Sequence, residues 1–573
     1  MQKILKLIQP DTQLQIGLIK ELGISPILAQ VMINRGIKSA SEAEKFLKPQ
    51  LPDLLSPWQM KDMEAAVNRV IRAARLREKV MIFGDYDVDG ITSVALLKMQ
   101  LERLGITVAH YIPHRINEGY GLNLTAGKIA KKNGFSLIIT VDCGINSRSE
   151  IERFRRWGID VIVTDHHEPQ GQMPEAYAIL NPKRRDCPYQ YKELSGVGVA
   201  FKLAQAVTKS NLWEDLDLVA LGTIADSVAL NGENRIIVSE GLKRIPASSR
   251  PGIQALMDAS GINRQKPLKA SVVSFILGPR INASGRVETA ESALRLLLCQ
   301  SNAEACDLAK TLNSYNRRRQ KIEEAIFREA QNLIDKEINF KEHSVIVLFG
   351  QDWHPGVLGI VASRLMEKFY RPTILISEPS TTFAATADGK SGGGLCRGSA
   401  RSIRDFSIFD ALLACRKHLN TFGGHKLAAG LTIAKDNIYN FRQDINRFAR
   451  QILLKEFLFP SIEVDMEISL ADLSKDLVYQ LSRIEPFGSA NPEPIFYTRN
   501  LTLRSEPEVL SRDTLKFWVT DSEFTYPVIG FGFGGLRHKL MESSSFDLVY
   551  CPEIDTWRDN QDIILEAKEI IFK

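Results

Sequence analysis

Short apolar runs alternate with amphipathic, helix-like segments in the first half of the chain. Four runs of β-branched and large apolar residues lie at 80–83, 106–112, 137–141 and 161–164. The stretches between them, such as 92–104, carry apolar residues at helical spacing. Strands that alternate with helices are typical of a parallel sheet with helices on both faces. The pattern therefore predicts an α/β, doubly wound parallel-sheet domain over residues 56–235.

The flanking segments differ in pattern from this domain. Residues 1–55 favour small helices that end at a run of prolines, and residues 236–338 favour a helical connector. Within the connector, Ser301 and Glu304 have the spacing of a capping box and predict a long inter-domain helix that ends near Ile338.

Apolar runs return after residue 339. Residues 339–455 predict a second α/β domain, which begins with the apolar run 344–349. Residues 456–573 alternate apolar and polar positions in several short strands, which is typical of a small β-barrel. The chain is thus expected to be multidomain, with two α/β domains, a long connecting helix and a C-terminal barrel.

Composition narrows the class of protein only slightly. A chain of 573 residues is too long for a single core, and its 44% hydrophobic and 25% charged residues are ordinary for a soluble protein. The net charge of +5 permits a nucleic-acid partner without requiring one. Seven cysteines without a Cys-x-x-Cys pair disfavour structural zinc and favour a reducing, cytoplasmic location. No apolar leader or transmembrane run is found, so no membrane partner is expected.

Acidic and histidine residues follow the predicted strands. They form four segments: Asp85, Asp87 and Asp89; Asp142; Asp165, His166 and His167; and Asp226. In open α/β sheets, ligands bind at the carboxyl ends of the strands, where most of these residues fall. Carboxylates and imidazole suit Mn²⁺ or Mg²⁺, and two such ions close together activate water and stabilise charge in phosphoryl transfer.

Each acidic segment also has a purely structural interpretation. The first resembles half of an EF-hand loop, but the glutamate due at position 12 is missing, because Ala95 or Leu96 stands there. Asp165 taken alone fits a helix N-cap equally well. Asp226 lies in an apolar segment, and a buried aspartate needs a partner. Four acidic segments at successive strand ends make a structural accident improbable.

These segments resemble the four motifs of the DHH phosphoesterase superfamily, which is named after an Asp-His-His triplet like the one at 165–167. The resemblance implies five metal ligands: Asp87, Asp89, Asp142, His166 and Asp226. It also implies catalytic roles for Asp142 as a bridge between two ions, for His167 at the scissile phosphate, and for Asp165 in orienting the histidines. Asp85 is expected to support the loop. Some members carry an additional histidine ligand where this chain has Phe83.

Longer segments resemble the RecJ family within this superfamily. They lie at 112–122, 194–200, 278–286, 353–364 and 485–494, and the resemblance spans roughly residues 20 to 570. It implies a metal-dependent exonuclease that degrades single-stranded DNA from the 5′ end to mononucleotides, in recombination and repair. It further implies two Mn²⁺ or Mg²⁺ ions, a single-stranded DNA partner, and a single-strand-binding protein and a helicase as protein partners.

Three further groups are candidates for binding DNA phosphates. Arg280, Asn282 and Arg286 lie among glycine, asparagine and proline, so they predict a loop that is either a phosphate clamp or a turn with solvated arginines. By resemblance, the substrate-binding, DHH-associated domain contributes Arg397, Ser399, Arg401, Gly423, Gly424 and His425. Its glycines either offer backbone N–H groups to phosphate or only permit close packing.

The C-terminal segment, 456–573, is by resemblance an OB-fold DNA-binding domain. Its aromatic residues include Phe517, Trp518, Phe531, Phe533 and Trp557, and the sequence singles out none of them as a stacking residue. Two other functions remain open. A phosphodiesterase for short oligonucleotides or cyclic dinucleotides is disfavoured by the C-terminal domain, and a non-catalytic scaffold is disfavoured by the five retained ligands.

Overall fold

The computed structural model describes residues 3–378, 395–555 and 562–573. The chain divides into two compact units. The barrel unit contains residues 1–53, 229–239 and 459–573, and the α/β unit contains residues 54–228 and 240–458. The barrel unit is thus built from segments that are far apart in the sequence.

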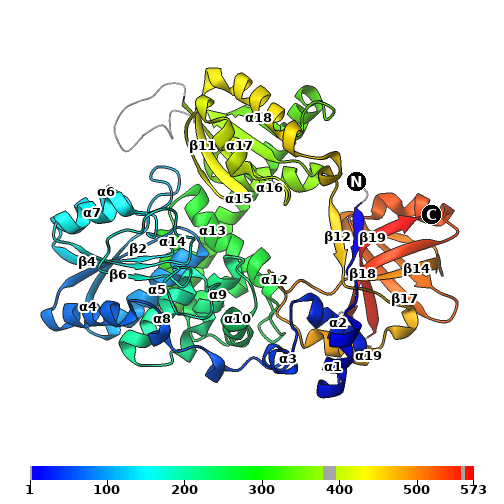
Figure 1. Cartoon of the computed structure of the whole chain (residues 1–573), viewed down its shortest axis with the longest axis horizontal. Helices are drawn as coiled ribbons and strands as arrows, with labels where there is room; N and C mark the ends of the chain where they lie inside the picture. Colours follow the sequence, from blue (N-terminus) through cyan, green and yellow to red (C-terminus); the bar gives the residue numbers. More distant parts are fainter. Residues whose placement is uncertain (1–2, 379–394, 556–561) are drawn as a thin grey trace. The chain divides into compact units, whose positions relative to one another are not determined.

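The first sheet of the α/β unit is parallel, as the sequence predicts. Its five strands are ordered β3-β2-β4-β5-β6. Their bounds are β2 (Lys79–Gly84), β3 (Thr107–Tyr111), β4 (Phe135–Val141), β5 (Asp160–Thr164) and β6 (Ala178–Leu180), of which β6 was not predicted. Helices α4 (Met63–Leu76), α5 (Val88–Arg103) and α8 (Gly196–Thr208) lie on one face, and α6 (Leu124–Lys132) and α7 (Arg148–Arg156) on the other (Figure 1).

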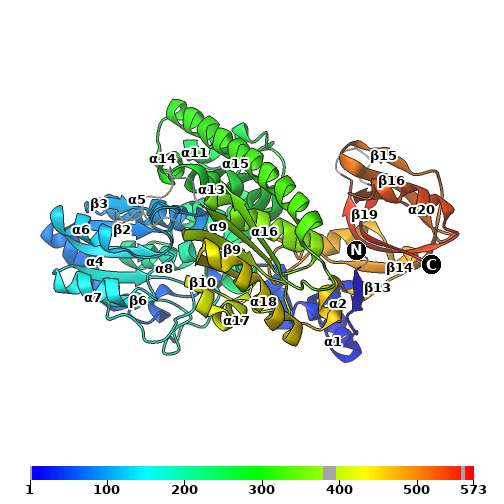
Figure 2. The same cartoon turned by 90° about the horizontal axis from the view of Figure 1, so that it is seen from above.

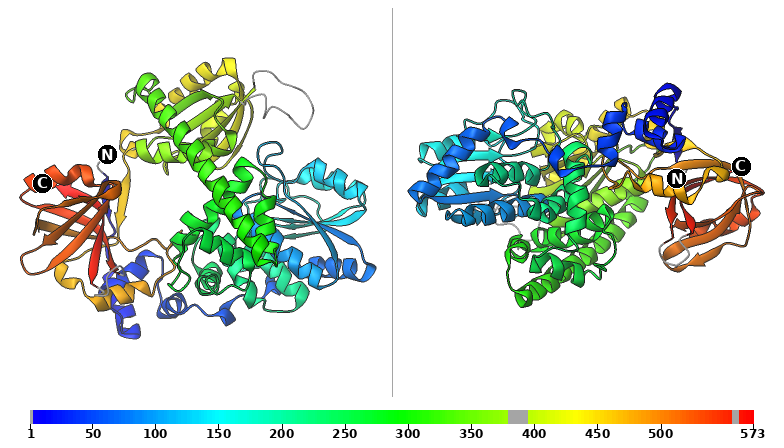
Figure 3. Two further views of the ribbon diagram at one scale, coloured as in Figure 1. Left: turned by 180° about the vertical axis from the view of Figure 1, so that it is seen from behind. Right: turned by 90° about the horizontal axis from the view of Figure 1, so that it is seen from below.

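A helical region follows this sheet. It contains α9 (Leu216–Ala225), α11 (Pro251–Ala259), α12 (Ala270–Val272), the π-helical turn η4 (Val273–Leu277), α13 (Gly278–Val287), α14 (Glu291–Leu298) and α15 (Asn302–Glu337). The last is the long green helix in the left view of Figure 3. Its N-cap is Ser301, whose side chain accepts a hydrogen bond from the N–H of Glu304. The long helix predicted from this capping pattern is therefore confirmed.

The second sheet of the α/β unit is mixed, with strand order β10-β11-β9-β8-β7. Its strands are β7 (Ile346–Gln351), β8 (Thr373–Glu378), β9 (Leu395–Arg401), β10 (Leu419–Gly424) and β11 (Ala428–Ala434). Only β7 and β8 are parallel. One face packs on α17 (Ile408–Ala414) and α18 (Ile438–Ile452), and the other packs on α15 and α16 (Pro355–Phe369). The glycine-rich segment 423–430 is thus a hairpin between β10 and β11.

The barrel unit has an OB-type, closed β-barrel (Figure 2), which confirms the predicted fold of the C-terminal segment. Its strands are β13 (Met466–Glu467), β14 (Phe496–Leu503), β15 (Glu508–Leu510), β16 (Thr514–Thr520), β17 (Thr525–Phe531), β18 (Phe546–Ile554) and β19 (Ile563–Phe572). The sheet order is β13-β14-β18-β19-β17-β16-β15, and pairing of β14 with β16 closes the barrel.

The N-terminal segment shares a hydrophobic core with this barrel. Helices α1 (Thr12–Leu22), α2 (Pro26–Asn34) and α3 (Ala40–Leu47) pack with barrel residues in one buried cluster. The segment also contains a strand that was not predicted, β1 (Ile4–Leu7), which pairs in parallel with β12 (Ser461–Val464). Arg235, on α10 (Gly232–Arg244), donates to the carbonyls of Phe46 and Ile484 and so joins three distant segments. None of the described helices is both long and apolar enough to cross a lipid bilayer.

Candidate metal centre and phosphate pocket

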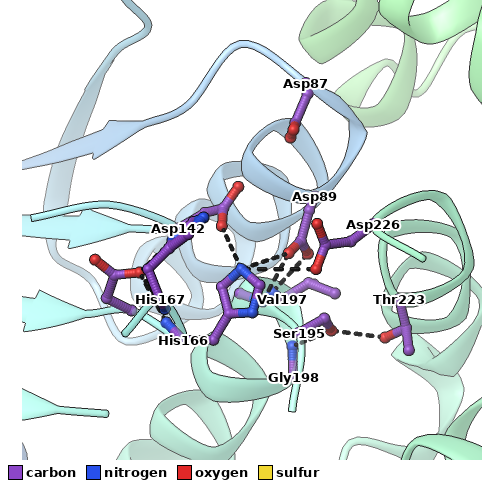
Figure 4. Close-up of polar contacts among 12 residues, drawn as sticks. Asp87, Asp89, Asp142, His166, His167, Ser195, Val197, Gly198, Thr223 and Asp226 are labelled. Atoms are coloured by element: carbon purple, nitrogen blue, oxygen red, sulfur yellow. Dashed lines mark hydrogen bonds and ion pairs between the residues drawn. The ribbon is translucent and has the colours of Figure 1, made fainter. Parts of the chain in front are cut away.

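The acidic residues meet where neighbouring strands of the first sheet end. Asp87 caps α5 after β2, and its carboxylate accepts a hydrogen bond from the N–H of Gly90 at 3.1 Å. Asp142 follows β4 directly and has φ of 59°, a strained conformation that is held by its surroundings. His166 follows β5, and Asp226 ends α9. These side chains point toward one another (Figure 4).

The imidazole of His166 lies at the middle of this cluster. Its Nε2 is 3.1 Å from Asp142 Oδ1, 3.6 Å from Asp226 Oδ2 and 3.9 Å from Asp89 Oδ2. The ligand atoms of Asp89, His166 and Asp226 all lie within 4.8 Å of one another, and so do those of Asp85, Asp87 and Asp142. The five metal ligands expected from the sequence therefore lie in one cluster, and Asp85 joins the second group as a further possible ligand.

The donor atoms of the cluster fit divalent cations. Asp85 Oδ1, Asp142 Oδ1, Asp226 Oδ2 and His166 Nε2 are buried without a hydrogen-bond partner. Such atoms are costly to bury, and a cation bound among them satisfies them. Hard oxygen ligands with one imidazole are the donor set that Mn²⁺ accepts.

Electrostatics support the same interpretation. Burial and the charge of Asp89 raise the pKa of Asp142, and burial and the charge of Asp87 raise the pKa of Asp89 to about 7. Burial lowers the pKa of His166 to about 3, so its imidazole is neutral, the form that binds metal. Without cations the carboxylates repel one another, and positive charge would relieve this repulsion.

Asp89 is held by the start of α8. Its two oxygens accept hydrogen bonds from the N–H groups of Gly196 (2.7 Å) and Val197 (2.8 Å), where the helix dipole favours negative charge. A Cβ atom at Gly196 would lie only 2.7 Å from Asp142 Oδ1. A glycine at this position therefore lets α8 approach both carboxylates.

Asp165 and His167 form a hydrogen-bonded pair beside the cluster. Asp165 Oδ1 accepts from the backbone N–H of His166 (2.8 Å) and lies 2.8 Å from His167 Nδ1, and Oδ2 accepts from the N–H of Ile145. Burial acts against the charge of Asp165, but the hydrogen bond and charge of His167 outweigh it and lower the pKa of Asp165. The buried aspartate thus holds the ring of His167 and the backbone of His166.

Tyr120 is a site residue that the sequence did not single out. Its hydroxyl donates to the carbonyl of Asp142 at 3.0 Å and lies 3.1 Å from His167 Nδ1. Its only signal was its position in the family-like segment 112–122. Phe83, by contrast, supplies no ligand: its ring is fully buried and stacks on Tyr111, with 5.6 Å between the ring centroids.

A pocket of about 640 Å³ lies within the α/β unit, between the metal centre and the second sheet. Its lining includes the side chains of Arg115, Arg286, Arg397 and Arg401. Residues 397, 399 and 401 alternate along β9 and thus share one face of the sheet. Burial and the charges of Arg115, Arg319 and Arg401 lower the pKa of Arg286 to about 9. This concentration of positive charge suits an anion such as phosphate.

Part of the pocket wall is formed by glycine backbone without side chains. Gly423 and Gly430 pair across β10 and β11, and both line the pocket. A Cβ atom at Gly423 would meet no atom within 4 Å, so it would occupy the open space of the pocket. Gly424 serves a different purpose, because a Cβ there would lie 2.4 Å from the Ala428 carbonyl oxygen. His425 is exposed and is not among the residues that line the pocket.

The segment with Arg280, Asn282 and Arg286 is a helix, so the predicted loop is wrong. Pro279 lies where the π-helical turn η4 passes into α13, within a helical run that is continuous from Ala270 to Val287. Asn282 accepts a hydrogen bond from the N–H of Val88 (3.1 Å) and so holds the acidic loop. Arg286 enters the pocket, whereas Arg280 donates to the carbonyl of Ile276 and does not line it.

Known proteins share both this fold and these segments. Three family models match: the DHH family N-terminal domain at 79–223, the DHHA1 domain at 342–451 and the RecJ OB domain at 464–569. RecJ of Bacillus subtilis is 37% identical over 562 residues, which cover 98% of this chain and 70% of that protein. This chain belongs to the RecJ family. RecJ of Escherichia coli is also 37% identical, over 82% of this chain and 83% of that protein.

The fold comparison agrees with this family membership. The crystal structure of Thermus thermophilus RecJ in complex with Mn²⁺ matches with a TM-score of 0.84 and 30% identity. The match covers 100% of this chain and 80% of that chain. A second structure of the same protein, in complex with Mg²⁺, matches with a TM-score of 0.78.

Proposed function

We propose that this RecJ-family chain is a metal-dependent exodeoxyribonuclease that hydrolyses single-stranded DNA from its 5′ end, releasing mononucleotides in recombination and repair. The relatives named above are single-stranded-DNA-specific exonucleases by name. The observation that carries the proposal is a cluster of buried, unpartnered metal-ligating atoms beside an arginine-lined pocket. A hydrolytic centre next to an anion pocket is suited to a phosphodiester chain.

Two divalent ions, Mn²⁺ or Mg²⁺, fit the two ligand groups. We assign one to Asp89, His166 and Asp226 and the other to Asp85 and Asp87, with Asp142 between them. In this assignment Asp85 replaces the histidine ligand that Phe83 does not provide. When bound, such ions supply an activated water and offset charge on the phosphate.

The neighbouring side chains then act directly on the DNA. The hydrogen bond that His167 donates to Asp165, and the charge of Asp165, raise the pKa of His167 despite its burial. Asp165 also lies against Nδ1, which leaves the other ring nitrogen of His167 able to donate to a phosphate oxygen. Asn282 holds the acidic loop through its hydrogen bond from the N–H of Val88, and Arg286 binds phosphate in the pocket.

We propose that this pocket receives the 5′-terminal phosphate of the strand. A terminal phosphate carries more negative charge than an internal phosphodiester, and four guanidinium groups favour the more charged group. Bare backbone at Gly423 and Gly430 gives such a phosphate room, because a Cβ atom at either position would meet no atom closer than 3.9 Å. A DNA end bound there would present its first internal phosphodiester to the metal centre.

The barrel offers a further surface for the strand. Trp518 on β16 and Phe531 on β17 are 40% and 64% exposed, and they line a groove of about 940 Å³ together with Lys516. Phe517 is buried in the barrel core, and Trp557 lies outside the described residues. Exposed aromatic side chains beside a lysine suit stacked bases, so Trp518 and Phe531 are the barrel residues that we assign to DNA.

The test uses DNA labelled at either end, single- or double-stranded, with each metal. We expect mononucleotides from the labelled 5′ end of single strands only, faster with a 5′ phosphate than with a 5′ hydroxyl, and none from Asp142→Ala. Gly423→Ala should raise KM for 5′-phosphorylated DNA more than for 5′-hydroxyl DNA. Equal attack on blunt duplex, or release in EDTA, would overturn the proposal.

Protein partners follow from the need for an unpaired end. We propose that a helicase and a single-strand-binding protein present the strand to this enzyme in the cytoplasm. Pull-down of each with the purified chain, and faster release of nucleotides in their presence, is the expected result. A rate that neither protein changes would contradict this part of the proposal.

A further inference from the structure

The carboxylate of Glu118 closes the loop between β3 and α6. Its Oε1 accepts hydrogen bonds from the hydroxyl of Tyr111 at 2.5 Å and from Nδ2 of Asn123 at 3.2 Å. Tyr111 ends β3, and Asn123 is the N-cap of α6. The other oxygen, Oε2, accepts from the backbone N–H of His114 at 2.6 Å. Glu118 thus ties the two ends of the loop to each other.

The loop folds back on itself around this carboxylate. The N–H of Glu118 donates to the carbonyl of His114 at 2.8 Å, and Nδ1 of His114 accepts from two further N–H groups of the loop, at 3.2 and 3.3 Å. Gly119 and Gly121, on either side of Tyr120, have φ of 78° and 94°, which favour glycine. The loop is therefore held in one form by its own polar groups and by its two glycines.

The same loop contacts residues of both groups of candidate metal ligands. The guanidinium of Arg115 lies over the ring of Tyr86, 4.5 Å from its centroid, and Tyr86 is part of the acidic loop 85–89. The hydroxyl of Tyr120 donates to the carbonyl of Asp142 at 3.0 Å. Because Asp142 has φ of 59°, its backbone needs such contacts to keep its strained conformation.

The hydroxyl of Tyr120 also determines how His167 is oriented. Its single hydrogen is donated to the carbonyl of Asp142, so toward Nδ1 of His167, 3.1 Å away, the hydroxyl oxygen can only accept. Asp165 Oδ1 lies 2.8 Å from the same nitrogen and is likewise an acceptor. Nδ1 of His167 therefore carries a hydrogen, and Nε2 is the ring nitrogen that is left for the substrate.

The opposite side of the loop belongs to the phosphate pocket. Residues 115–120 line this pocket, together with residues of β9 and β10. Arg397, on β9, donates to the carbonyl of Ile116 and so binds the loop to the second sheet. A phosphate in the pocket would therefore contact the same loop that holds Asp142 and His167.

We infer that Glu118 is a positioning residue for hydrolysis, because it holds the loop in the form that brings Arg115 to the phosphate and Tyr120 to the metal centre. This inference rests on the proposed nuclease function. Within the described residues, the hydrogen bonds of the Glu118 carboxylate all stay between residues 111 and 123. Glu118 thus acts through Arg115 and Tyr120.

The test measures kcat and KM for 5′-phosphorylated, 20-nucleotide single strands at saturating Mn²⁺. In Glu118→Gln, an amide NH₂ group would face hydrogen-bond donors in place of a carboxylate oxygen, and the loop would loosen. We expect kcat to fall at least about tenfold and KM to rise. A carboxylate that merely lines an anion pocket repels phosphate, so its removal would lower KM, and a lower KM with unchanged kcat would overturn the inference.

Two further variants accompany this measurement. Tyr111→Phe removes one donor to Glu118 and keeps the ring that stacks on Phe83, so it should lower kcat about threefold. Glu102→Gln is the matched control, because this carboxylate pairs with Lys98 on α5. Its kcat and KM should equal those of wild type.

A double variant shows whether Glu118 acts through Tyr120. Tyr120→Phe keeps the ring and removes the hydroxyl, and it should lower kcat about tenfold. If the loop carries the effect, adding Glu118→Gln to Tyr120→Phe should change kcat by no more than about threefold. Two effects that multiply to about 100-fold would contradict the inference.

Hydrogen exchange measures the loop without hydrolysis. In EDTA, the amides of residues 113–122 should exchange about tenfold faster in Glu118→Gln than in wild type, and at the wild-type rate in Glu102→Gln. Equal exchange in Glu118→Gln and wild type would overturn the inference. A wild type that shows this protection but releases no nucleotides from single strands would instead overturn the nuclease function.

Discussion

Substitution of Gly196 by alanine perturbs the metal centre without removing a ligand. The added Cβ would lie 2.7 Å from both Cβ and Oδ1 of Asp142, much closer than such atoms approach in proteins. Asp142 has little freedom to retreat, because it is buried and follows β4 directly. The start of α8 would therefore shift away, and with it the N–H groups that bind Asp89.

The size of the effect follows from these contacts. Overpacking a buried site costs about 1–3 kcal/mol, and weakening a hydrogen bond to a charged acceptor costs about 1.5–3 kcal/mol. Part of this cost is relieved by movement of the helix, which leaves Asp89 and Asp142 misplaced for a shared ion. Since 1.4 kcal/mol is tenfold in affinity, Gly196→Ala should weaken Mn²⁺ binding about 10- to 100-fold.

Calorimetric titration with Mn²⁺ and the rate of nucleotide release measure this effect. Gly198→Ala is the matched control, because its Cβ would meet only the side chains of Leu194 and Ser195, at 3.2 to 3.4 Å. It should keep wild-type affinity and lose at most about 1 kcal/mol of stability. Equal Mn²⁺ affinity for Gly196→Ala and wild type would refute the placement of α8 against the two carboxylates.

Three further results are expected. In EDTA, Asp142→Asn should raise Tm, and the increase should be larger at pH 8 than at pH 5. The reason is that the raised pKa of Asp142 makes the wild-type protein lose stability as pH rises above about 4. A lower Tm for the variant would contradict this. Mn²⁺ affinity should rise with pH up to about 7, the pKa of Asp89, because binding releases protons. Calorimetry in buffers of different ionisation enthalpy detects the released protons. An affinity that does not depend on pH would argue against this prediction. Arg235→Met should destabilise the barrel unit by about 3 kcal/mol in urea unfolding, because the substitution leaves the carbonyls of Phe46 and Ile484 without a hydrogen-bond donor. An unchanged unfolding midpoint would show that water replaces the arginine as the donor.

Local patterns predicted the elements that depend on local interactions. The strands that lead to Asp87, Asp142 and His166 are apolar runs because both faces of a parallel sheet are buried. The long helix α15 was readable from its Ser301 cap and its apolar spacing. Most of the ligands were recognisable because they lie in contiguous motifs at strand ends, whereas Asp226 ends the helix α9 instead of a strand.

Glycine and proline misled the sequence interpretation where helix packing overrode their local preferences. Residues 278–286 contain both and resemble a loop, yet they form α13, which continues the helical run that begins at Ala270, and Gly278 packs closely on Ala225. The N-terminal helices gave no sign of their partner, since their apolar faces are completed by barrel residues more than 400 positions away. Side-chain pattern shows that a face is buried but not what covers it.

The sequence by itself determined the fold class, the family and the set of candidate metal ligands, because these depend on residue type and short-range spacing. Tertiary structure alone brought Gly196 against Asp142, Asn282 against the acidic loop, and Tyr120 to His167. Each of these contacts joins segments whose separation along the chain carries no local signal. Only the packing of helices on sheets sets the distances between them.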